Sequence, residues 1–200
     1  MTIATAIFAA SPRIIPAVCV KYFLAIVPPP HLSQQIEEFR AAFGPAKTTP
    51  HITVKAPNSL SKLDDWLPQV SELCRRIAPF KVTLADVGQF GASILFIRVD
   101  STGLVALHHA LLNIVNSPPD EQATYFEGPS FLPHLTVAHT ESGITESELA
   151  AMIPLAKTKW TQPISFMANA LVMYRALAAD SPYKEYQTIP LTGLETLPSA

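Results

Sequence analysis

Two segments of the chain place a histidine and a threonine in the same pattern: Pro50-His51-Ile52-Thr53 and Pro133-His134-Leu135-Thr136. At this composition the pattern Pro-His-x-Thr is expected roughly 0.05 times per chain if positions are independent, so two copies favour a shared role. An imidazole has an unperturbed pKa of about 6.5 and can give or take a proton at neutral pH. The pair therefore predicts proton transfer by two histidines, assisted by two hydroxyl groups.

Both segments are apolar and β-branched, which indicates strands. Side chains alternate between the faces of a strand, so His51 and Thr53 share one face while Ile52 points to the other. The same holds for His134 and Thr136. Two such polar faces opposed across a cleft would bring an acid, a base and two hydroxyl donors together. Two core strands that each tolerate a hydrogen-bonded histidine stay open as the alternative.

This set of groups suits in-line displacement at a phosphodiester. One imidazole would remove a proton from the attacking oxygen, and the other would protonate the leaving oxygen. A threonine hydroxyl would donate to a non-bridging phosphate oxygen, where negative charge grows in the transition state. The four residues offer no carboxylate or thiolate, so they are poor ligands for a hard metal ion or for zinc. We therefore expect neither a metal nor another cofactor.

Lys55 is a further candidate for binding substrate, because it lies four residues after His51 and so on the same strand face. Its ammonium would add positive charge near the phosphate, although a solvated lysine at a strand end fits the sequence equally well. His139 lies five residues after His134, so on a regular strand it faces the other side and is set aside. Adjacent histidines at 108 and 109 do not face each other on a helix, which argues against a metal pair there.

Aromatic side chains near the motifs could stack a nucleotide base, but packing in the core or in loops is the favoured interpretation. These residues are Tyr22, Tyr125, Phe126 and Phe131. Arg175 stands at the end of a predicted strand, where it could meet phosphate, but a surface role is favoured.

The remaining sequence predicts alternating strands and helices. Strands are expected at 22–27, 51–56, 80–85, 94–99, 131–139, 164–174 and 186–191. Helices are indicated by apolar residues at helical spacing and by two segments that resemble capping boxes, Ser61 with Asp64 and Thr145 with Glu148. The stretch 117–128 is predicted to be a loop.

The predicted order of elements is β-α-β-α-β-β-α-β-α-β-β. After the first strand and helix, a strand-helix-strand-strand unit starts at His51 and again at His134, which indicates an internal duplication. Antiparallel strands with helices to one side are typical of the α+β class. We therefore expect a bilobal α+β fold, in which two pseudo-symmetric lobes of antiparallel sheet with flanking helices surround a central cleft.

The composition limits the class of protein further. Apolar residues make up 48% of the chain, enough for a substantial core, and the formal net charge is −2. A weakly acidic chain has no global positive field to hold long nucleic acid, which points to a small or end-bound ligand. Cys19 and Cys74 are too few for a disulfide scaffold or a zinc site, so a cytoplasmic location is expected.

We divide the chain into an N-terminal extension (1–20), a single bilobal domain (21–193) and a C-terminal tail (194–200). The extension is apolar and nearly uncharged, and Pro12 and Pro16 interrupt it. A loose extension is therefore favoured over a cleaved signal peptide, which stays the alternative. No apolar run approaches the length of about 18 residues that suggests a membrane span, so no membrane partner is expected.

The two motifs, in full His51-Ile52-Thr53-Val54 and His134-Leu135-Thr136-Val137, resemble the paired His-x-Thr/Ser-x motifs of the 2H phosphoesterase superfamily. Within it the chain looks like the 2'-5' RNA ligase-like branch, which includes RNA 2',3'-cyclic phosphodiesterases. The resemblance runs from Lys21 to Leu191 and includes the opening strand Tyr-Phe-Leu-Ala-Ile-Val before a run of prolines.

The resemblance implies a bilobal α+β fold with a V-shaped cleft and metal-independent hydrolysis of 2',3'-cyclic phosphates to 2'-phosphates. The activity that the resemblance implies includes, for some members of the superfamily, the joining of RNA ends through a 2'-5' linkage. Carried over residue by residue, His51 and His134 would form the acid/base pair, and Thr53 and Thr136 would bind phosphate. The expected partner is RNA with a cyclic phosphate end or a small cyclic nucleotide, and we expect a monomer. A non-catalytic nucleotide- or RNA-end-binding module on the same fold is the alternative.

Overall fold

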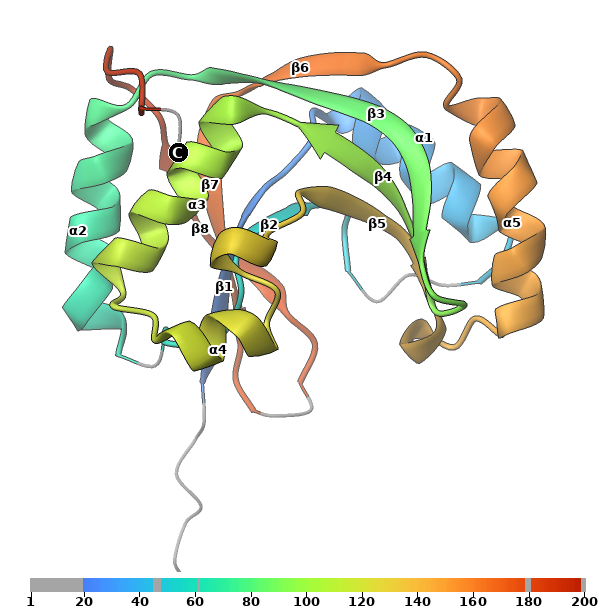
Figure 1. Cartoon of the computed structure of the whole chain (residues 1–200), viewed down its shortest axis with the longest axis horizontal. Helices are drawn as coiled ribbons and strands as arrows, with labels where there is room; N and C mark the ends of the chain where they lie inside the picture. The colour runs from blue at the N-terminus through green and yellow to red at the C-terminus, as the bar shows by residue number, and fades with distance from the viewer. Residues whose placement is uncertain (1–19, 45–47, 61, 179–180, 199–200) are drawn as a thin grey trace, which may run out of the picture.

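A single curved sheet of antiparallel strands organises the fold (Figure 1). The computed structural model describes residues 20–44, 48–60, 62–178 and 181–198. The strands are β1 (Lys21–Ile26), β2 (Ile52–Lys55), β3 (Phe80–Phe90), β4 (Ile94–Asp100), β5 (His134–His139), β6 (Ile164–Ala168), β7 (Ala170–Ala176) and β8 (Lys184–Pro190). They are ordered β6-β3-β4-β5-β2-β1-β7-β8 across the sheet.

Helices connect these strands. They are α1 (Pro30–Ala41), α2 (Leu63–Arg76), α3 (Thr102–Ile114), the short α4 (Pro119–Thr124), α5 (Glu146–Lys159) and the 3-10 turns η1 (Gly128–Ser130) and η2 (Thr140–Ser142). Figure 1 shows α2 and α3 side by side at one side of the molecule, with α1 and α5 at the other side. In the part of the chain that the structure describes, no helix has the length and apolar character needed to cross a membrane.

The sheet consists of two halves that repeat one arrangement. One half contains β6, β3, β4 and β5, and the other contains β8, β7, β1 and β2, so β5 and β2 meet at the centre. A single residue pair, Ile52 opposite Leu135, joins the two halves in the ladder, and we call this contact the seam. The expected α+β fold of pseudo-symmetric antiparallel sheet with flanking helices is thus confirmed, as two halves of one continuous sheet.

One face of the sheet carries the main core. Apolar residues of α1, α2, α3 and α5 pack there against the strands in one large cluster, in which Ile52 and Leu135 are fully buried. The opposite face carries a small aromatic cluster around Phe23 and Tyr174. We call this second face the open face. Because side chains alternate along a strand, His51 points to the open face while its neighbour enters the core.

The repeated unit begins and ends at other strands than the sequence predicts. Each motif strand ends a strand-helix-strand unit, β1-α1-β2 in one half and β4-α3-β5 in the other, instead of starting a strand-helix-strand-strand unit. The predicted strand 164–174 is divided at Asn169, and its two parts belong to different halves: β6 pairs with β3, and β7 pairs with β1. One apolar run therefore serves both halves of the sheet, which periodicity along the chain does not reveal.

Of the predicted capping boxes and loops, some are confirmed and others are not. The capping box at Thr145 is confirmed, because its hydroxyl accepts from the Glu148 N–H while the Glu148 carboxylate accepts from the Thr145 N–H. Helix α2 begins at Leu63 without a side-chain cap, and Ser61, the predicted capping residue, lies outside the described residues. The predicted loop at 117–128 contains the short helix α4.

The ends of the domain are only partly described. Of the predicted extension 1–20, all but Val20 lies outside the described residues. The start of the predicted tail 194–200 runs beside the end of α2, where Glu195 pairs with Ile77 in an isolated bridge. This contact fixes the polypeptide after β8 against the helical layer.

Candidate active site

The two motif strands bring four polar side chains together on the open face. The seam pair sets an antiparallel register, in which His51 lies opposite Thr136 and Thr53 lies opposite His134. His51 and Thr136 line the same pocket. All four residues are half-buried. Each histidine therefore faces the threonine of the other motif.

The same kind of backbone contact orients both imidazoles. His51 Nδ1 lies 2.8 Å from the carbonyl oxygen of Thr49, and His134 Nδ1 lies 2.8 Å from that of Leu132, in each case two residues earlier. A carbonyl oxygen can only accept, so Nδ1 carries the proton and donates it in both rings. Nε2 of each neutral ring then has a lone pair that can accept a proton.

Aromatic rings from the next two strands of each half pack on each imidazole. The first imidazole contacts Phe23 of β1 and Tyr174 of β7, with ring centroids 5.0 and 5.4 Å away. The second imidazole contacts Phe96 of β4 and Phe90 of β3, at 5.4 and 5.2 Å. Gly88 of β3 leaves room for the Phe96 ring, since an added methyl group would lie 2.6 Å from it. The surroundings of the two histidines are thus closely similar.

Burial lowers the pKa of both His51 and His134 from the ordinary value of 6.5, because their surroundings solvate a cation poorly. The Nδ1 contact with the backbone opposes that effect in each ring. The positive charges of Arg40 and of His134 lower the pKa of His51 further. Protonation of one ring therefore disfavours protonation of the other, as expected for two coupled groups.

Each motif strand has a β-bulge at the last residue of its motif. In the ladder with β1, successive residues of β1 pair on either side of Val54, which has no partner residue there. In the ladder with β4, successive residues of β4 pair on either side of Val137. A bulge adds one residue to the strand and reverses the alternation of faces beyond it. Lys55 and His139 both lie beyond a bulge, so the predicted face of each is reversed.

Arg40 of α1 reaches across the seam to the bulge of the second motif. Its buried guanidinium donates to the carbonyl oxygens of Thr136, of Val137 at 2.9 Å and of Thr48 at 3.2 Å. Burial lowers its pKa to about 10, so it remains a cation at neutral pH. Arg40 is not among the residues that the sequence predicts for the site. The helical spacing of the sequence could have indicated that Arg40 is buried, because Arg40 follows Ile36 by one helical turn and so lies on the buried stripe of α1.

His139 lines the pocket together with His51 and Thr136, contrary to the prediction from strand parity. The bulge in β5 returns its side chain to the open face. Its Nδ1 accepts from the Glu141 N–H at 3.1 Å, so the neutral ring carries its proton on Nε2. A third imidazole can therefore donate a hydrogen bond where the other two accept.

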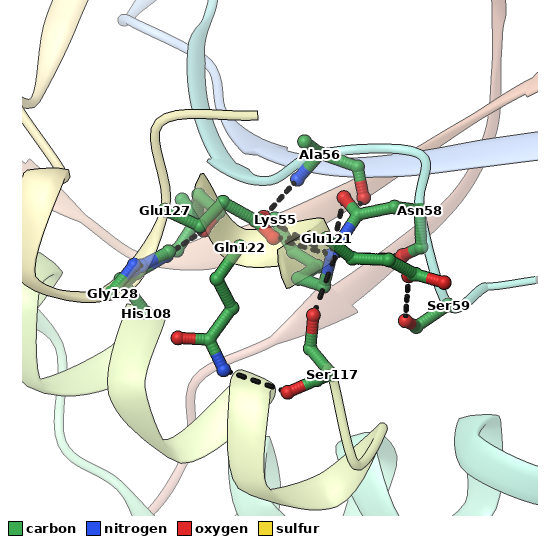
Figure 2. Close-up of polar contacts among 11 residues, drawn as sticks. Lys55, Ala56, Asn58, Ser59, His108, Ser117, Glu121, Gln122, Glu127 and Gly128 are labelled. Atoms are coloured by element: carbon green, nitrogen blue, oxygen red, sulfur yellow. Dashed lines mark hydrogen bonds and ion pairs between the residues drawn. The ribbon is translucent and has the colours of Figure 1, made fainter. Parts of the chain in front are cut away.

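Lys55, predicted to bind substrate, belongs instead to a buried polar cluster. The bulge in β2 turns it away from the open face, and its side chain is fully buried. Nζ lies 3.0 Å from both carboxylate oxygens of Glu127 and also donates to oxygens of Ala56 and Asn58, as Figure 2 shows. These internal partners give the ammonium a structural role, because they tie β2 to the segment before η1.

His108 of α3 stands beside this cluster and holds the bulge of the first motif. Its Nδ1 donates to the Val54 carbonyl oxygen at 2.7 Å, and its Nε2 accepts from the Gly128 N–H at 2.9 Å. The ring stacks on Phe131 at a centroid distance of 3.7 Å. Both nitrogens are engaged in a way that only a neutral ring allows, and burial lowers the pKa of His108.

Of the four motif residues, His51 and Thr136 line the pocket, and neither the aromatic candidates nor Arg175 does. Tyr22 is buried in the core, and Phe131 stacks on the α3 imidazole. Tyr125 and Phe126 are exposed. The guanidinium of Arg175 packs on a tyrosine ring of β8, with 3.9 Å to the ring centroid.

The side chains of the pocket suit an anion. They include imidazole, hydroxyl and guanidinium groups, which can donate hydrogen bonds to phosphate oxygens. Among the described residues, no cluster of three or more His, Cys, Asp or Glu side chains is arranged to hold a metal ion.

Known proteins share this fold. A sequence model described as the 2'-5' RNA ligase superfamily matches residues 28–180. The crystal structure of TT0787 from Thermus thermophilus matches with a TM-score of 0.58 and 19% identity, over 86% of this chain and 98% of that one. The crystal structure of apo E. coli LigT matches with a TM-score of 0.58 and 21% identity, over 88% of this chain and 99% of that one. The structure of LigT with 3'-AMP matches with a TM-score of 0.54 and 20% identity, over 87% of this chain and 99% of that one. No curated protein matches the chain by sequence.

Proposed function

The chain belongs to the 2'-5' RNA ligase superfamily, and on that premise we propose that it hydrolyses 2',3'-cyclic phosphates, on RNA ends or small nucleotides, to 2'-phosphates. His51 and His134 would act as acid and base, without a metal ion. The observation that carries this proposal is the matched pair of imidazoles, each oriented through Nδ1 so that Nε2 is available for proton transfer.

In the proposed reaction, one neutral imidazole takes a proton from water while the water oxygen attacks phosphorus. The bond between phosphorus and O3' breaks, and the other imidazole, which is protonated, gives its proton to O3'. Thr53 and Thr136 donate to non-bridging oxygens, and Arg40 and His139 add positive potential and a further donor. One water molecule is consumed, and the product is a 2'-phosphate with a 3'-hydroxyl group.

Nucleotides are the favoured ligand class. Crystal structures of E. coli LigT hold 3'-AMP, ATP and NADP+, so a relative of the same fold accepts nucleotides of different size. The net charge of −2 favours a small or end-bound ligand over a long RNA. We propose a monomer acting in the cytoplasm through the single domain 21–193, with 2'-5' RNA ligation as a second activity to be tested.

The alternative is a non-catalytic module that binds nucleotides or RNA ends. Binding alone requires no matched acid and base, and here both imidazoles have the same tautomer and similar aromatic packing. This symmetry favours the enzyme.

The experiment is a panel of cyclic phosphates: a 2',3'-cyclic mononucleotide, an oligonucleotide with a cyclic end and an ADP-ribose-derived cyclic phosphate. Turnover is followed by phosphorus NMR, which also identifies the position of the product phosphate. We expect 2'-phosphates. Tight binding of 2'- or 3'-nucleotides with no turnover of any substrate would contradict the enzyme and support the binding module.

A further inference from the structure

Phe90 presents an exposed aromatic ring beside His134. It is the last residue of β3, and its ring stacks on that of Phe96 with a centroid distance of 4.2 Å and an interplanar angle of 28°. The ring of Phe96 is buried, whereas Phe90 is 37% exposed. An exposed apolar side chain is ordinary by itself. This one is distinguished by its place at the border of the candidate active site.

The sequence of β3 builds the stack of two rings. Gly88 and Phe90 are two residues apart, so they share one face of the strand. Gly88 lies opposite Phe96 in the ladder, and an added methyl group at Gly88 would be 2.6 Å from the Phe96 ring. Because Gly88 has no side chain, the Phe96 ring can lie over the strand, and the ring of Phe90 covers it.

The imidazole of His134 lies beside the two stacked rings. Its centroid is 5.2 Å from that of Phe90 and 5.4 Å from that of Phe96, at interplanar angles of 85° and 60°. Because the two distances are nearly equal, the imidazole is next to the stack and does not cover the outer face of Phe90. The Phe96 ring occupies the inner face. A flat group of a ligand can therefore stack on Phe90 and remain next to His134.

The corresponding rings beside His51 are closed off by their own neighbours. Phe23 and Tyr174 stack with a centroid distance of 4.6 Å, and both are buried. A third ring, that of half-buried Tyr183, packs edge-on against Phe23 at 4.8 Å. Of the four aromatic rings that the structure places on the two motif histidines, Phe90 is the exposed one.

The charges of the open face agree with a ligand that has an anionic end and an apolar end. Arg40 lines the pocket of His51, and its guanidinium makes its hydrogen bonds to backbone carbonyl oxygens. Its positive charge therefore favours phosphate oxygens there. Arg98 pairs with His134 in the ladder, but it is already neutralised by ion pairs with a carboxylate of β3 and a carboxylate of β4. The phosphate thus fits the first half, and an aromatic base fits the second.

We propose that Phe90 is the platform on which the base of the bound nucleotide stacks, so that the nucleoside lies on the β3–β4 side of the open face. The assignment rests on the proposed function, in which the phosphate reacts between the two motif histidines. One ribose joins that phosphate to the base, so a base on Phe90 stays adjacent to it. Every base has an aromatic face, but a purine offers more of it. We therefore expect purine nucleotides to bind more tightly than pyrimidine nucleotides.

The first test measures affinity for 2'-phosphates by isothermal titration calorimetry of the intact protein. The ligands are 2'-AMP, 2'-UMP and methyl ribofuranoside 2-phosphate, which has no base, and we expect affinity to fall in that order. Phe90→Ala should weaken binding of 2'-AMP by roughly ten- to a hundredfold more than binding of the ligand without a base. Any effect that passes through His134 acts on both ligands, so the ratio of their affinities isolates stacking. An unchanged ratio in Phe90→Ala overturns the proposal.

Matched variants separate the ring from its bulk and from its place. Phe90→Leu keeps an apolar side chain without a ring, so it should lose the preference for a base, whereas Phe90→Trp should keep it. Tyr125→Ala removes an exposed ring at the end of α4, outside the pocket, and should keep the wild-type ratio. If the preference is lost in Tyr183→Ala but kept in Phe90→Ala, the base lies beside His51 and the proposal is overturned.

The affinities separate this proposal from the proposed enzyme. If no 2',3'-cyclic phosphate is turned over, the enzyme is contradicted, while the binding of 2'-nucleotides still decides the role of Phe90. If cyclic phosphates are turned over but 2'-AMP binds no more tightly than the ligand without a base, the enzyme stands and the stacking platform is overturned. A wild-type protein that binds none of the three ligands overturns the platform as well.

Discussion

Arg40 and His108 bind the same backbone position of the two motifs, each from the opposite half of the molecule. Arg40 Nε donates to the carbonyl oxygen of Val137 at 2.9 Å, and His108 Nδ1 donates to that of Val54 at 2.7 Å. Both valines are bulge residues that lack a partner residue in the ladder. The two side chains therefore supply the hydrogen bonds that the bulges need, and they brace a seam made of one residue pair.

The first prediction concerns His108 and pH. The folded protein holds this ring neutral and its pKa below 6.5, whereas the unfolded chain takes up a proton as the pH falls through 6.5. Stability is thus present above pH 6.5 and lost as the pH falls toward the lower folded pKa, by at most roughly 1.4 kcal/mol per pH unit for each such ring. His51 and His134 contribute with the same sign.

Replacing His108 with Gln should remove its share of this pH dependence. Urea unfolding at about pH 7.5 and about pH 5.5 measures the difference in stability between the two conditions. His31→Gln, at an exposed position of α1, is the matched control and should keep the wild-type difference. An unchanged difference in His108→Gln would show that His108 is not the group responsible.

The buried ion pair gives a prediction about stability. Glu127→Gln should destabilise the fold by roughly 3–5 kcal/mol, because the ammonium of Lys55 would be buried without a compensating charge. Urea unfolding at neutral pH measures the loss. The double variant Lys55→Met with Glu127→Leu removes both charges and should recover most of the stability. If Glu127→Gln were as stable as the wild-type protein, Glu127 would not be needed to compensate the buried charge of Lys55.

Gly88 gives a prediction that links packing to the site. Gly88→Ala would place a methyl group 2.6 Å from the Phe96 ring, which packs on His134. We expect a loss of about 1–3 kcal/mol in stability and a lower kcat/KM, because the ring must move. Adding Phe96→Leu should restore stability by making room, but it should not restore full activity. Unchanged Tm and kcat/KM in the Gly88→Ala variant would show that close packing of Phe96 on His134 is not needed for stability or activity.

His139 should contribute to binding the product phosphate. His139→Leu removes the Nε2 donor from the pocket, so affinity for a 2'-nucleotide should fall roughly tenfold or more. His139→Gln places an amide N–H near the same position and should recover part of the affinity. Isothermal titration calorimetry measures both constants, with His31→Gln as the control. Equal affinity in His139→Leu and wild type would remove His139 from the site.

The limits of the sequence can be stated from particular residues. The alternation of side chains along a strand correctly predicts that His51 and Thr53 share a face, and that His134 and Thr136 do. Each of these three-residue stretches ends before the bulge. Lys55 and the residue at 139 lie beyond the bulges, so counting by two assigns each of them to the opposite face. One backbone irregularity, repeated in both motifs, thus explains both errors.

Long-range contacts mark the second limit. Arg40 lies on the apolar stripe of its helix, but its partners are backbone atoms of a strand far along the chain, and no local pattern names them. The division of the last predicted strand at Asn169 also depends on the sheet, because the two parts pair in different halves. Most of the element order and the faces of the residues before each bulge follow from local sequence, whereas bulges and cross-half contacts depend on tertiary structure.

The central claim is that His51 and His134 act as one acid–base pair, and kcat/KM for a 2',3'-cyclic nucleotide tests it most directly. Because both groups act in one step, each alanine variant should lose roughly 10²–10⁴-fold. The double variant should be about as slow as the slower single variant, since the two residues work as a unit. His31→Ala, at an exposed position, should keep the wild-type value. Wild-type turnover by either single variant would contradict the account.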